Sequence, residues 1–323
     1  MYRTATGVSP MVIRSRRAVS HALSLCLASA ALLIPSATVC AHEAHENEAH
    51  ENSLHFSHPL ITESPSPDTK VRLDTFFFDQ DGEQTTTFRL EAEYAFHPSF
   101  SIEVDVPLTR IEADGGGGSV SNLDTIGVGF KFANDAFAAH GVLLTYGLEL
   151  GLPTGDDRKG IGSGHELEIA PFFAVGYKTG RWELVSFLEF AIPTNQARGQ
   201  DLGPSPGPDP GTAVLASTLR DGSKRAQSEG EGASEEGEIE TELGWTLSAL
   251  YWFSPRVQGL LELDLATVLS GDETGNGVLN LSPGVKFKPW AKSPWWLGAS
   301  LGFPVSNQEE FNVRALVSGF YHF

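Results

Sequence analysis

Apolar and polar residues alternate along the chain from about residue 70 to its end. The stretch Phe88-Arg-Leu-Glu-Ala-Glu-Tyr94 is typical, and the same alternation occurs at 102–108 and 144–152. A period of two places successive side chains on opposite faces of a β-strand. We therefore expect strands with one apolar face and one polar or charged face.

Twelve segments follow this pattern, and most are longer than the five or six residues usual for strands of soluble proteins. They lie near residues 70–79, 85–96, 100–112, 123–134, 142–153, 165–178, 181–193, 239–253, 257–269, 278–289, 294–306 and 310–323. No apolar run after residue 41 is long enough for a spanning helix. Closed barrels are the other structures that pair every backbone group inside a bilayer. The sequence predicts an all-β fold, a transmembrane antiparallel up-and-down β-barrel of about twelve strands over residues 70–323, in the outer membrane.

The connections between these segments alternate between short and long. The short ones lie at 97–99, 135–141, 178–180, 254–256 and 288–294, and the longer ones at 113–122, 155–164, 195–238 and 271–277. Outer-membrane barrels have short periplasmic turns and longer external loops. We expect the longest connection, 195–238, to be a disordered acidic extracellular loop, because it is rich in Pro, Gly, Ser and Glu.

Aromatic residues gather at the predicted periplasmic end. Tryptophan favours the membrane interface, and we predict that five tryptophans beside short turns are interface anchors: Trp182, Trp252, Trp290, Trp295 and Trp296. The last strand ends in Tyr321 and Phe323, which resemble the terminal signal that the outer-membrane assembly machinery recognises. That machinery and outer-membrane lipid are the expected partners.

The first 41 residues have the layout of a secretory signal peptide. Arg14, Arg16 and Arg17 precede an apolar run at 23–34, and small residues follow near residue 41. A basic segment, a short apolar segment and a small-residue cleavage site are typical of such signals. We expect an exported chain that begins near His42.

The two cysteines and the net charge narrow the class of protein. Cys26 and Cys40 both lie in the predicted signal peptide, so the exported chain is expected to have no disulfide. The formal net charge is −19. A nucleic-acid partner needs a basic surface, so none is expected.

Charged residues fall on the face of each strand opposite to the apolar residues. We predict that they line the lumen, with acidic positions at Asp74, Glu91, Glu93, Glu103, Asp105, Glu149, Glu166, Glu168, Glu183, Glu189, Glu240, Glu242, Glu262 and Asp264, and basic positions at Arg72, Arg89, Lys131, Lys286, Lys288 and Arg314. Such an interior either forms a path that favours cations or neutral polar solutes, or is filled by ion pairs with little flow.

The segment 42–69 is rich in His and then in Pro, and we expect a mobile periplasmic tail or a partial plug. Its histidines, His42, His45, His50, His55 and His58, are interleaved with glutamates. Imidazole with carboxylate suits zinc, nickel or copper(II). The alternatives are weak divalent metal binding at this N-terminal segment and a solvated leader with no ligand role. We expect no other cofactor.

Catalysis is not expected. His165 and His322 are predicted at opposite ends of the barrel, and His140 stands alone in a turn, so no histidine has an evident nucleophile partner. The Gly-rich stretches 115–118 and 160–164 lack the Gly-Lys-Ser/Thr ending of a phosphate-binding loop.

The stretch Leu148-Glu-Leu-Gly-Leu-Pro-Thr-Gly-Asp156, followed by Gly160-Ile-Gly-Ser-Gly164, resembles the meta-pathway phenol-degradation family of outer-membrane proteins, often called transporters. The entry segment His58-Pro-Leu-Ile-Thr-Glu-Ser-Pro65 is also similar to that of some members. The resemblance implies a barrel and uptake of small hydrophobic or aromatic compounds, and it supplies no catalytic residues.

Together these features indicate an outer-membrane channel or transporter for passive passage of a small solute, either a cation, a neutral polar compound or a small hydrophobic compound. The alternative is a non-conducting structural or binding barrel whose His-rich segment captures metal, and a barrel enzyme is a third hypothesis.

Overall fold

The computed structural model describes residues 54–80, 82–114, 118–194, 241–270, 274–306 and 311–323. The chain divides into two units, Met1–Ala49 and His50–Phe323, and all described residues belong to the second. The predicted signal peptide and the whole of the loop 195–238 lie outside the described residues.

The described residues form one antiparallel sheet of 13 strands. The strands are β1 (Lys70–Gln80), β2 (Glu83–His97), β3 (Phe100–Ala113), β4 (Ser119–Leu123), β5 (Ile126–Asn134), β6 (Val142–Leu152), β7 (Glu168–Thr179), β8 (Trp182–Pro193), β9 (Glu242–Ser254), β10 (Val257–Val268), β11 (Gly277–Phe287), β12 (Trp295–Pro304) and β13 (Val313–His322).

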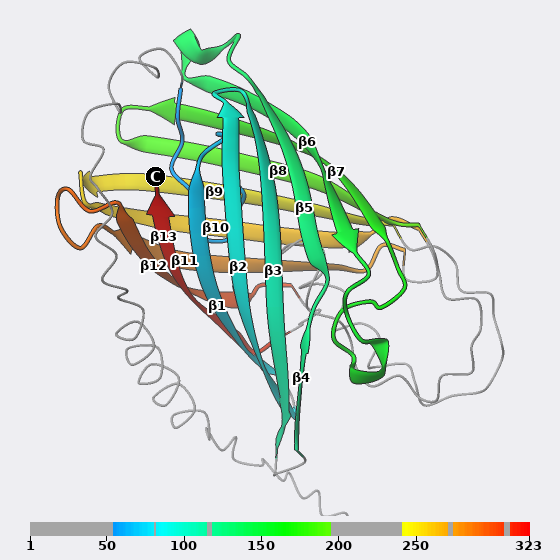
Figure 1. The fold of residues 1–323 in the computed structure, drawn as a ribbon. Helices are drawn as coiled ribbons and strands as arrows, with labels where there is room; N and C mark the ends of the chain where they lie inside the picture. The colour runs from blue at the N-terminus through cyan, green and yellow to red at the C-terminus, as the bar shows by residue number, and fades with distance from the viewer. Residues whose placement is uncertain (1–53, 81, 115–117, 195–240, 271–273, 307–310) are drawn as a thin grey trace, which may run out of the picture. The chain divides into compact units, whose positions relative to one another are not determined.

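The sheet closes on itself. The first strand, β1, pairs with the last strand, β13, and with β2, and β2 pairs in turn with β3. Both β4 and β5 pair with β3, at different levels, and so occupy one position in the wall. The barrel therefore has twelve strand positions, which confirms the predicted fold. In Figure 1 the strands of the front wall (β1, β2 and β3) cross those behind, as tilted strands on opposite walls do.

β4 lies almost entirely within the connection predicted at 113–122, so this position of the wall begins earlier in the chain than the predicted segment 123–134. Asp124 and Thr125 leave the ladder between β4 and β5, and the Asp124 amide donates to the carbonyl of Pro107. The loop after β6 folds back over this point: the Thr154 hydroxyl donates to the Asp124 carbonyl (2.7 Å) and accepts from the Ile126 amide (2.9 Å). The Leu-Pro-Thr-Gly-Asp stretch therefore closes a gap in the wall.

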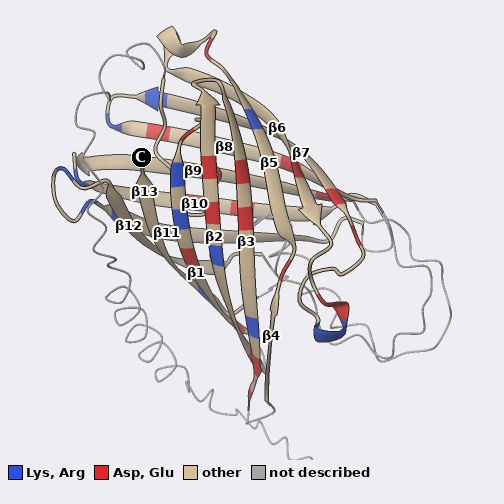
Figure 2. Ribbon diagram, viewed as in Figure 1, with Lys and Arg blue, Asp and Glu red and all other residues tan. Residues whose placement is uncertain are grey.

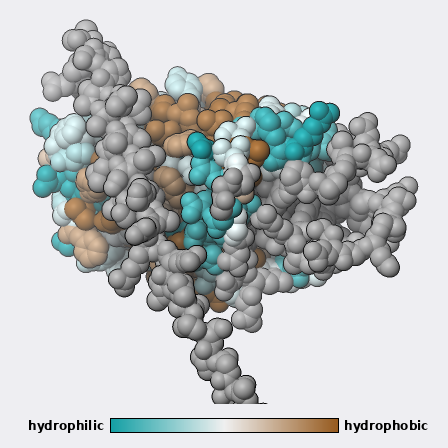
Figure 3. Space-filling model, turned by 90° about the horizontal axis from the view of Figure 1, so that it is seen from below, coloured by the Kyte–Doolittle hydropathy of each residue, from teal (hydrophilic) through white to brown (hydrophobic). Residues whose placement is uncertain are grey.

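Burial along the wall is the reverse of that in a soluble protein. On β2, Leu90 and Tyr94 are 48% and 55% exposed. Arg89 and Glu91, on either side of Leu90, are buried. Apolar side chains gather in a patch on the outer surface with polar residues to either side (Figure 3). An apolar exterior around a polar interior is the arrangement that a bilayer requires. Among the described residues, no helix is both long and apolar enough to span a membrane.

Candidate functional site

The interior of the barrel holds a segment of its own chain, residues 54–69, which we call the plug segment. Phe56, Leu60 and Ile61 of this segment are almost fully buried and belong to the same apolar cluster as Leu250 and Phe320 of the wall. Of the two alternatives drawn from the sequence, these residues form a partial plug. Residues 42–53 lie outside the described part of the chain.

Two wall glycines make room for the plug segment. A Cβ placed on Gly298 would lie 2.4 Å from Cδ2 of Leu60, and one placed on Gly176 would lie 2.6 Å from Cζ of Phe56. Neither separation is possible for real carbon atoms, so any larger residue at either position would displace the plug side chain.

A single wall carboxylate binds the middle of the plug segment. Glu262 on β10 accepts hydrogen bonds from the backbone amides of Leu60 (3.3 Å), Ile61 (3.0 Å) and Thr62 (3.0 Å). The Ser248 hydroxyl also donates to it, at 2.6 Å. Glu262 is fully buried, and three converging amides supply the donors that a buried carboxylate needs.

Other wall residues bind the backbone of the plug segment along its length. Lys286 donates to the carbonyl of His58 and Arg72 to that of Leu60. Glu183 accepts from the amide of Ser57 at 2.8 Å. The plug segment is therefore attached to the wall both by the apolar packing of Phe56, Leu60 and Ile61 and by hydrogen bonds and ion pairs along its backbone.

Two lysines connect the plug segment to the first strands of the wall. The Lys131 ammonium lies 2.6 Å from Oε1 of Glu63 and 3.1 Å from Oε1 of Glu93. The Lys70 ammonium lies 2.7 Å from Glu91 and 2.9 Å from Glu93. Burial alone would raise the pKa of the Glu63 carboxyl, but Lys131 and Lys70 lower that pKa to about 2. Glu63 is therefore ionised at neutral pH. Lys70 and Glu63 were not among the predicted interior charges, although Lys70 shares the face of Arg72.

The same part of the wall carries a second group of ion pairs. Asp74 accepts from Arg72 at 2.8 Å and from Nε of Arg89 at 3.1 Å, and also from the Ser318 hydroxyl. Basic bands on β1 lie beside acidic bands on β2 and β3 in Figure 2. Here charges of opposite sign are interleaved.

From β3 round to β8, the inner face of the wall is mainly acidic. The carboxylates of Asp105 on β3 and Glu149 on β6 both lie close to Gly127. A Cβ on Gly127 would lie 2.8 Å from Oδ2 of Asp105 and 2.7 Å from Oε1 of Glu149. Glu189 on β8 is buried, and its Oε1 atom has no hydrogen-bond partner among the described residues. We call Asp105, Glu149 and Glu189 the acidic wall.

Most of the predicted lumen residues lie on the inner face of a strand. Those whose side chains are buried there are Arg72, Asp74, Arg89, Glu91, Glu93, Asp105, Lys131, Glu168, Glu183, Glu189, Glu242, Glu262, Asp264, Lys286 and Arg314. Glu103 and Glu149 are partly buried. Glu166 and Lys288 lie just outside β7 and β11, in the connections, and Glu240 lies outside the described residues.

Two of the five predicted interface anchors were placed on the wrong face. Trp252 and Trp296 point inward: their rings pair with centroids 5.6 Å apart, and the Trp252 indole donates to Glu183 at 2.8 Å. The prediction used closeness to a turn, whereas the period of two assigns both residues to the inner face. Trp182, Trp290 and Trp295 are exposed.

The last strand presents its aromatic end residues on the outside. Tyr321 packs against Trp295, with ring centroids 4.9 Å apart, and Phe323 is 75% exposed. Recognition of Tyr321 and Phe323 by the assembly machinery stays a prediction.

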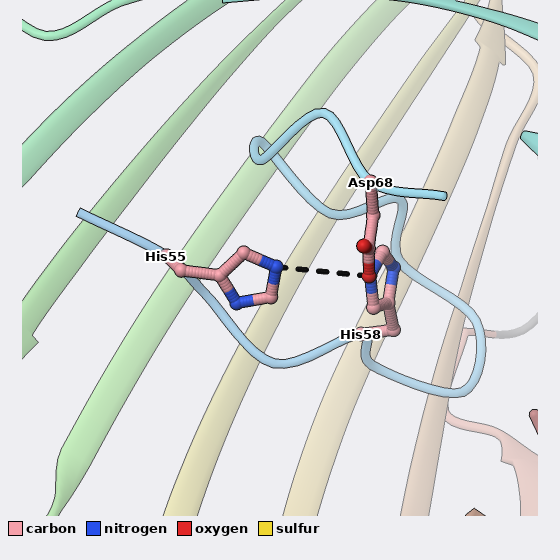
Figure 4. Close-up of side chains that lie close together, drawn as sticks. All are labelled: His55, His58 and Asp68. Atoms are coloured by element: carbon pink, nitrogen blue, oxygen red, sulfur yellow. Dashed lines mark hydrogen bonds and ion pairs between the residues drawn. The ribbon is translucent and has the colours of Figure 1, made fainter. Parts of the chain in front are cut away.

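Histidines of the plug segment and of the last strand converge on one carboxylate. Asp68 Oδ2 lies 2.9 Å from Nε2 of His58, 3.6 Å from Nε2 of His55 and 2.7 Å from Nδ1 of His322. Figure 4 shows the two plug histidines facing Asp68 inside the barrel. Nδ1 of His58 faces the Lys70 ammonium at 3.1 Å. His42, His45 and His50 lie outside the described residues.

The electrostatics of this cluster follow from its burial. Loss of water and the nearby Lys70 ammonium hold the pKa of His58 well below its usual range, so the imidazole is neutral. Burial opposes ionisation of Asp68, but contacts with His322, His55 and His58 lower the pKa of its carboxyl. The cluster thus combines a neutral imidazole with an ionised carboxylate.

The histidine nearest to a catalytic arrangement is His165. Its Nδ1 lies 3.0 Å from Oδ2 of Asp157 in the exposed loop before β7. Within the described part of the chain, no Ser or Thr hydroxyl bonds to its ring. His140 lies exposed in the short 3-10 helix η2 (Ala138–His140).

Comparison with known proteins supports the fold. An outer membrane channel from Pseudomonas putida F1 shares 13% sequence identity, with a TM-score of 0.56, over 83% of this chain and 100% of that one. The NanC porin shares 7% identity over 78% of this chain and 99% of that one, with a TM-score of 0.48. No protein-family model and no curated protein matches the chain. The fold is thus that of an outer-membrane channel barrel, and the resemblance to the phenol-degradation family is not confirmed.

Proposed function

We propose that this protein is a diffusion channel of the outer membrane for small cations and neutral polar solutes, narrowed by the plug segment. The observation that carries the proposal is the content of the interior, which is polar, charged and partly filled by a separate segment. The interior of a small barrel can be filled by side chains of its own wall. Here an inserted segment occupies the space, and it is held to the wall by non-covalent contacts alone, both polar and apolar.

The preference for cations rests on the distribution of interior charge. Among the described residues, buried carboxylates outnumber buried ammonium and guanidinium groups. The bases concentrate near β1, where they pair with acids, whereas Glu189 has Glu149, Glu168 and Glu242 as its electrostatic neighbours. A path along the acidic wall would attract cations and repel anions.

Neutralising two members of the acidic wall should weaken cation selectivity. In a water-filled path, a charge about 8 Å from a passing ion contributes about 0.5 kcal/mol. Each charge favours a cation and disfavours an anion by this amount, so the double variant Glu149→Gln, Glu189→Gln should lower the ratio of cation to anion permeability roughly 30-fold. The measurement is the reversal potential of the refolded protein in a planar bilayer under a salt gradient.

Asp135→Asn is the matched control, because Asp135 is exposed in the turn between β5 and β6. It removes one negative charge from the protein without touching the interior, and selectivity should stay at the wild-type value. Anion selectivity of the wild-type protein would contradict the acidic path. A barrel that stays folded and silent even without the plug segment would favour the structural hypothesis.

A further inference from the structure

Three ligand groups at the two ends of the plug segment lie close enough together to hold one metal ion. Nε2 of His55, Nε2 of His58 and one oxygen of Asp68 all lie within 4.8 Å of one another. We infer that these three residues bind one divalent transition-metal ion of the zinc type, with water as a further ligand.

The spacing of the ligand atoms fits such an ion. Zinc binds imidazole nitrogen and carboxylate oxygen at about 2.0–2.2 Å, and its ligands lie about 3.3 Å apart in a tetrahedron. The oxygen of Asp68 is 2.9 Å from Nε2 of His58 and 3.6 Å from Nε2 of His55. These two separations lie on either side of the ideal value, and the two Nε2 atoms lie within 4.8 Å of each other. Two imidazoles with one carboxylate also suit zinc, nickel and copper(II), whereas calcium and magnesium prefer sites made of oxygen ligands alone.

Two other carboxylate groups of similar spacing are already occupied by the protein's own cations. The group Glu63, Glu91 and Glu103 surrounds the Lys70 ammonium, which lies 2.7 Å from Glu91 and 3.8 Å from Glu63. The group that joins His58 to Glu63 and Glu93 has the Lys131 ammonium 2.6 Å from Glu63. Asp68, on the Nε2 side of His58, differs from these carboxylates. Among the described residues, no lysine or arginine lies within ion-pairing distance of it.

The surroundings provide the support that metal ligands need. His322 holds the Asp68 carboxylate through Nδ1 at 2.7 Å. A metal on Nε2 of His58 requires the ring proton on Nδ1, which now faces Lys70. Glu63 and Glu93 each place a carboxylate oxygen within 4.8 Å of a ring nitrogen of His58, and Lys70 also contacts Glu91 and Glu93.

Access and topology are also suitable. The His55 side chain is 54% exposed, so an ion can reach the site from solution. His55 and His58 begin the plug segment and Asp68 ends it (Figure 4). The ion would therefore clip the two ends of this segment together.

The test is zinc binding to the refolded full chain in detergent, measured by competition with a chromogenic chelator, with cobalt(II) absorption as a report of coordination. We expect one tight ion per chain. His55→Ala and Asp68→Asn should each weaken binding more than about 100-fold, and His322→Gln, which removes only support, about 10- to 100-fold. Heat-dependent mobility on a denaturing gel checks that each variant is a folded barrel.

Two controls separate the site from loose capture by other histidines. His140→Ala removes an exposed histidine of η2, and the triple variant His42→Ala, His45→Ala, His50→Ala removes the histidines that precede the plug segment. Both should retain the tight ion. Absence of one-to-one binding in the wild type, or its loss in the triple variant with retention in folded His55→Ala, overturns the inference.

Discussion

Replacing Glu262 with alanine should release the plug segment and raise the mean single-channel conductance to that of a barrel without it. The Glu262 carboxylate accepts three plug amides and the Ser248 hydroxyl inside the barrel. Hydrogen bonds to a buried charged group contribute about 1.5–3 kcal/mol each. Losing the three amide contacts should cost at least about 4 kcal/mol, which is roughly a thousandfold shift from the docked to the undocked plug.

The reference for this experiment is a chain that lacks residues 54–66, which sets the conductance of the barrel without its plug. Asp264→Asn is the matched control, because Asp264 is a buried wall acid that binds Arg314 and Asn280 and makes no contact with the plug segment. It should keep the conductance of the wild type. If the deletion opens the channel and Glu262→Ala does not, then Glu262 is not the anchor.

The wall of the barrel was predictable because its signal is local. In a strand, the period of two fixes which face each side chain occupies, and a bilayer outside makes the apolar face the outer one. Arg89, Glu91 and Glu93 could therefore be assigned to the interior from the sequence. Trp252 and Trp296, which were wrongly predicted as interface anchors, show that the period of two is a better guide to the face of a strand than closeness to a turn.

The plug could not be predicted with the same certainty, because its contacts are remote in the sequence. Thr62 and Glu262 are separated by 200 residues, and no local pattern in a polar, Pro-rich segment indicates that it is buried. The pairing of the interior charges could not be predicted for the same reason. The period of two places Asp74 and Arg89 on the inner face. That these two side chains contact each other depends on the register of β1 and β2, which the sequence does not give.

The glycines under the plug allow a second large effect to be tested without changing any charge. Gly298→Ala should undock the plug segment, because the added Cβ would lie 2.4 Å from Leu60. Overpacking of this kind costs about 1–3 kcal/mol, so the docked population should fall about 5- to 150-fold. Gly176→Ala should act in the same way through Phe56, with a Cβ at 2.6 Å. Single-channel recordings should show longer or larger openings.

A double variant makes this prediction specific to the plug. Leu60→Ala removes the methyl groups that the new Cβ would meet but also loses buried apolar contact, so the effects of the two substitutions on conductance should be less than additive in the double variant Gly298→Ala, Leu60→Ala. Gly319→Ala is the matched control, since a Cβ there meets Leu297 at an ordinary 3.8 Å. Additive effects in the double variant would show that Gly298 acts on the wall itself. Effects that are less than additive would establish that conductance follows the contact between the Leu60 side chain and the glycine beneath it.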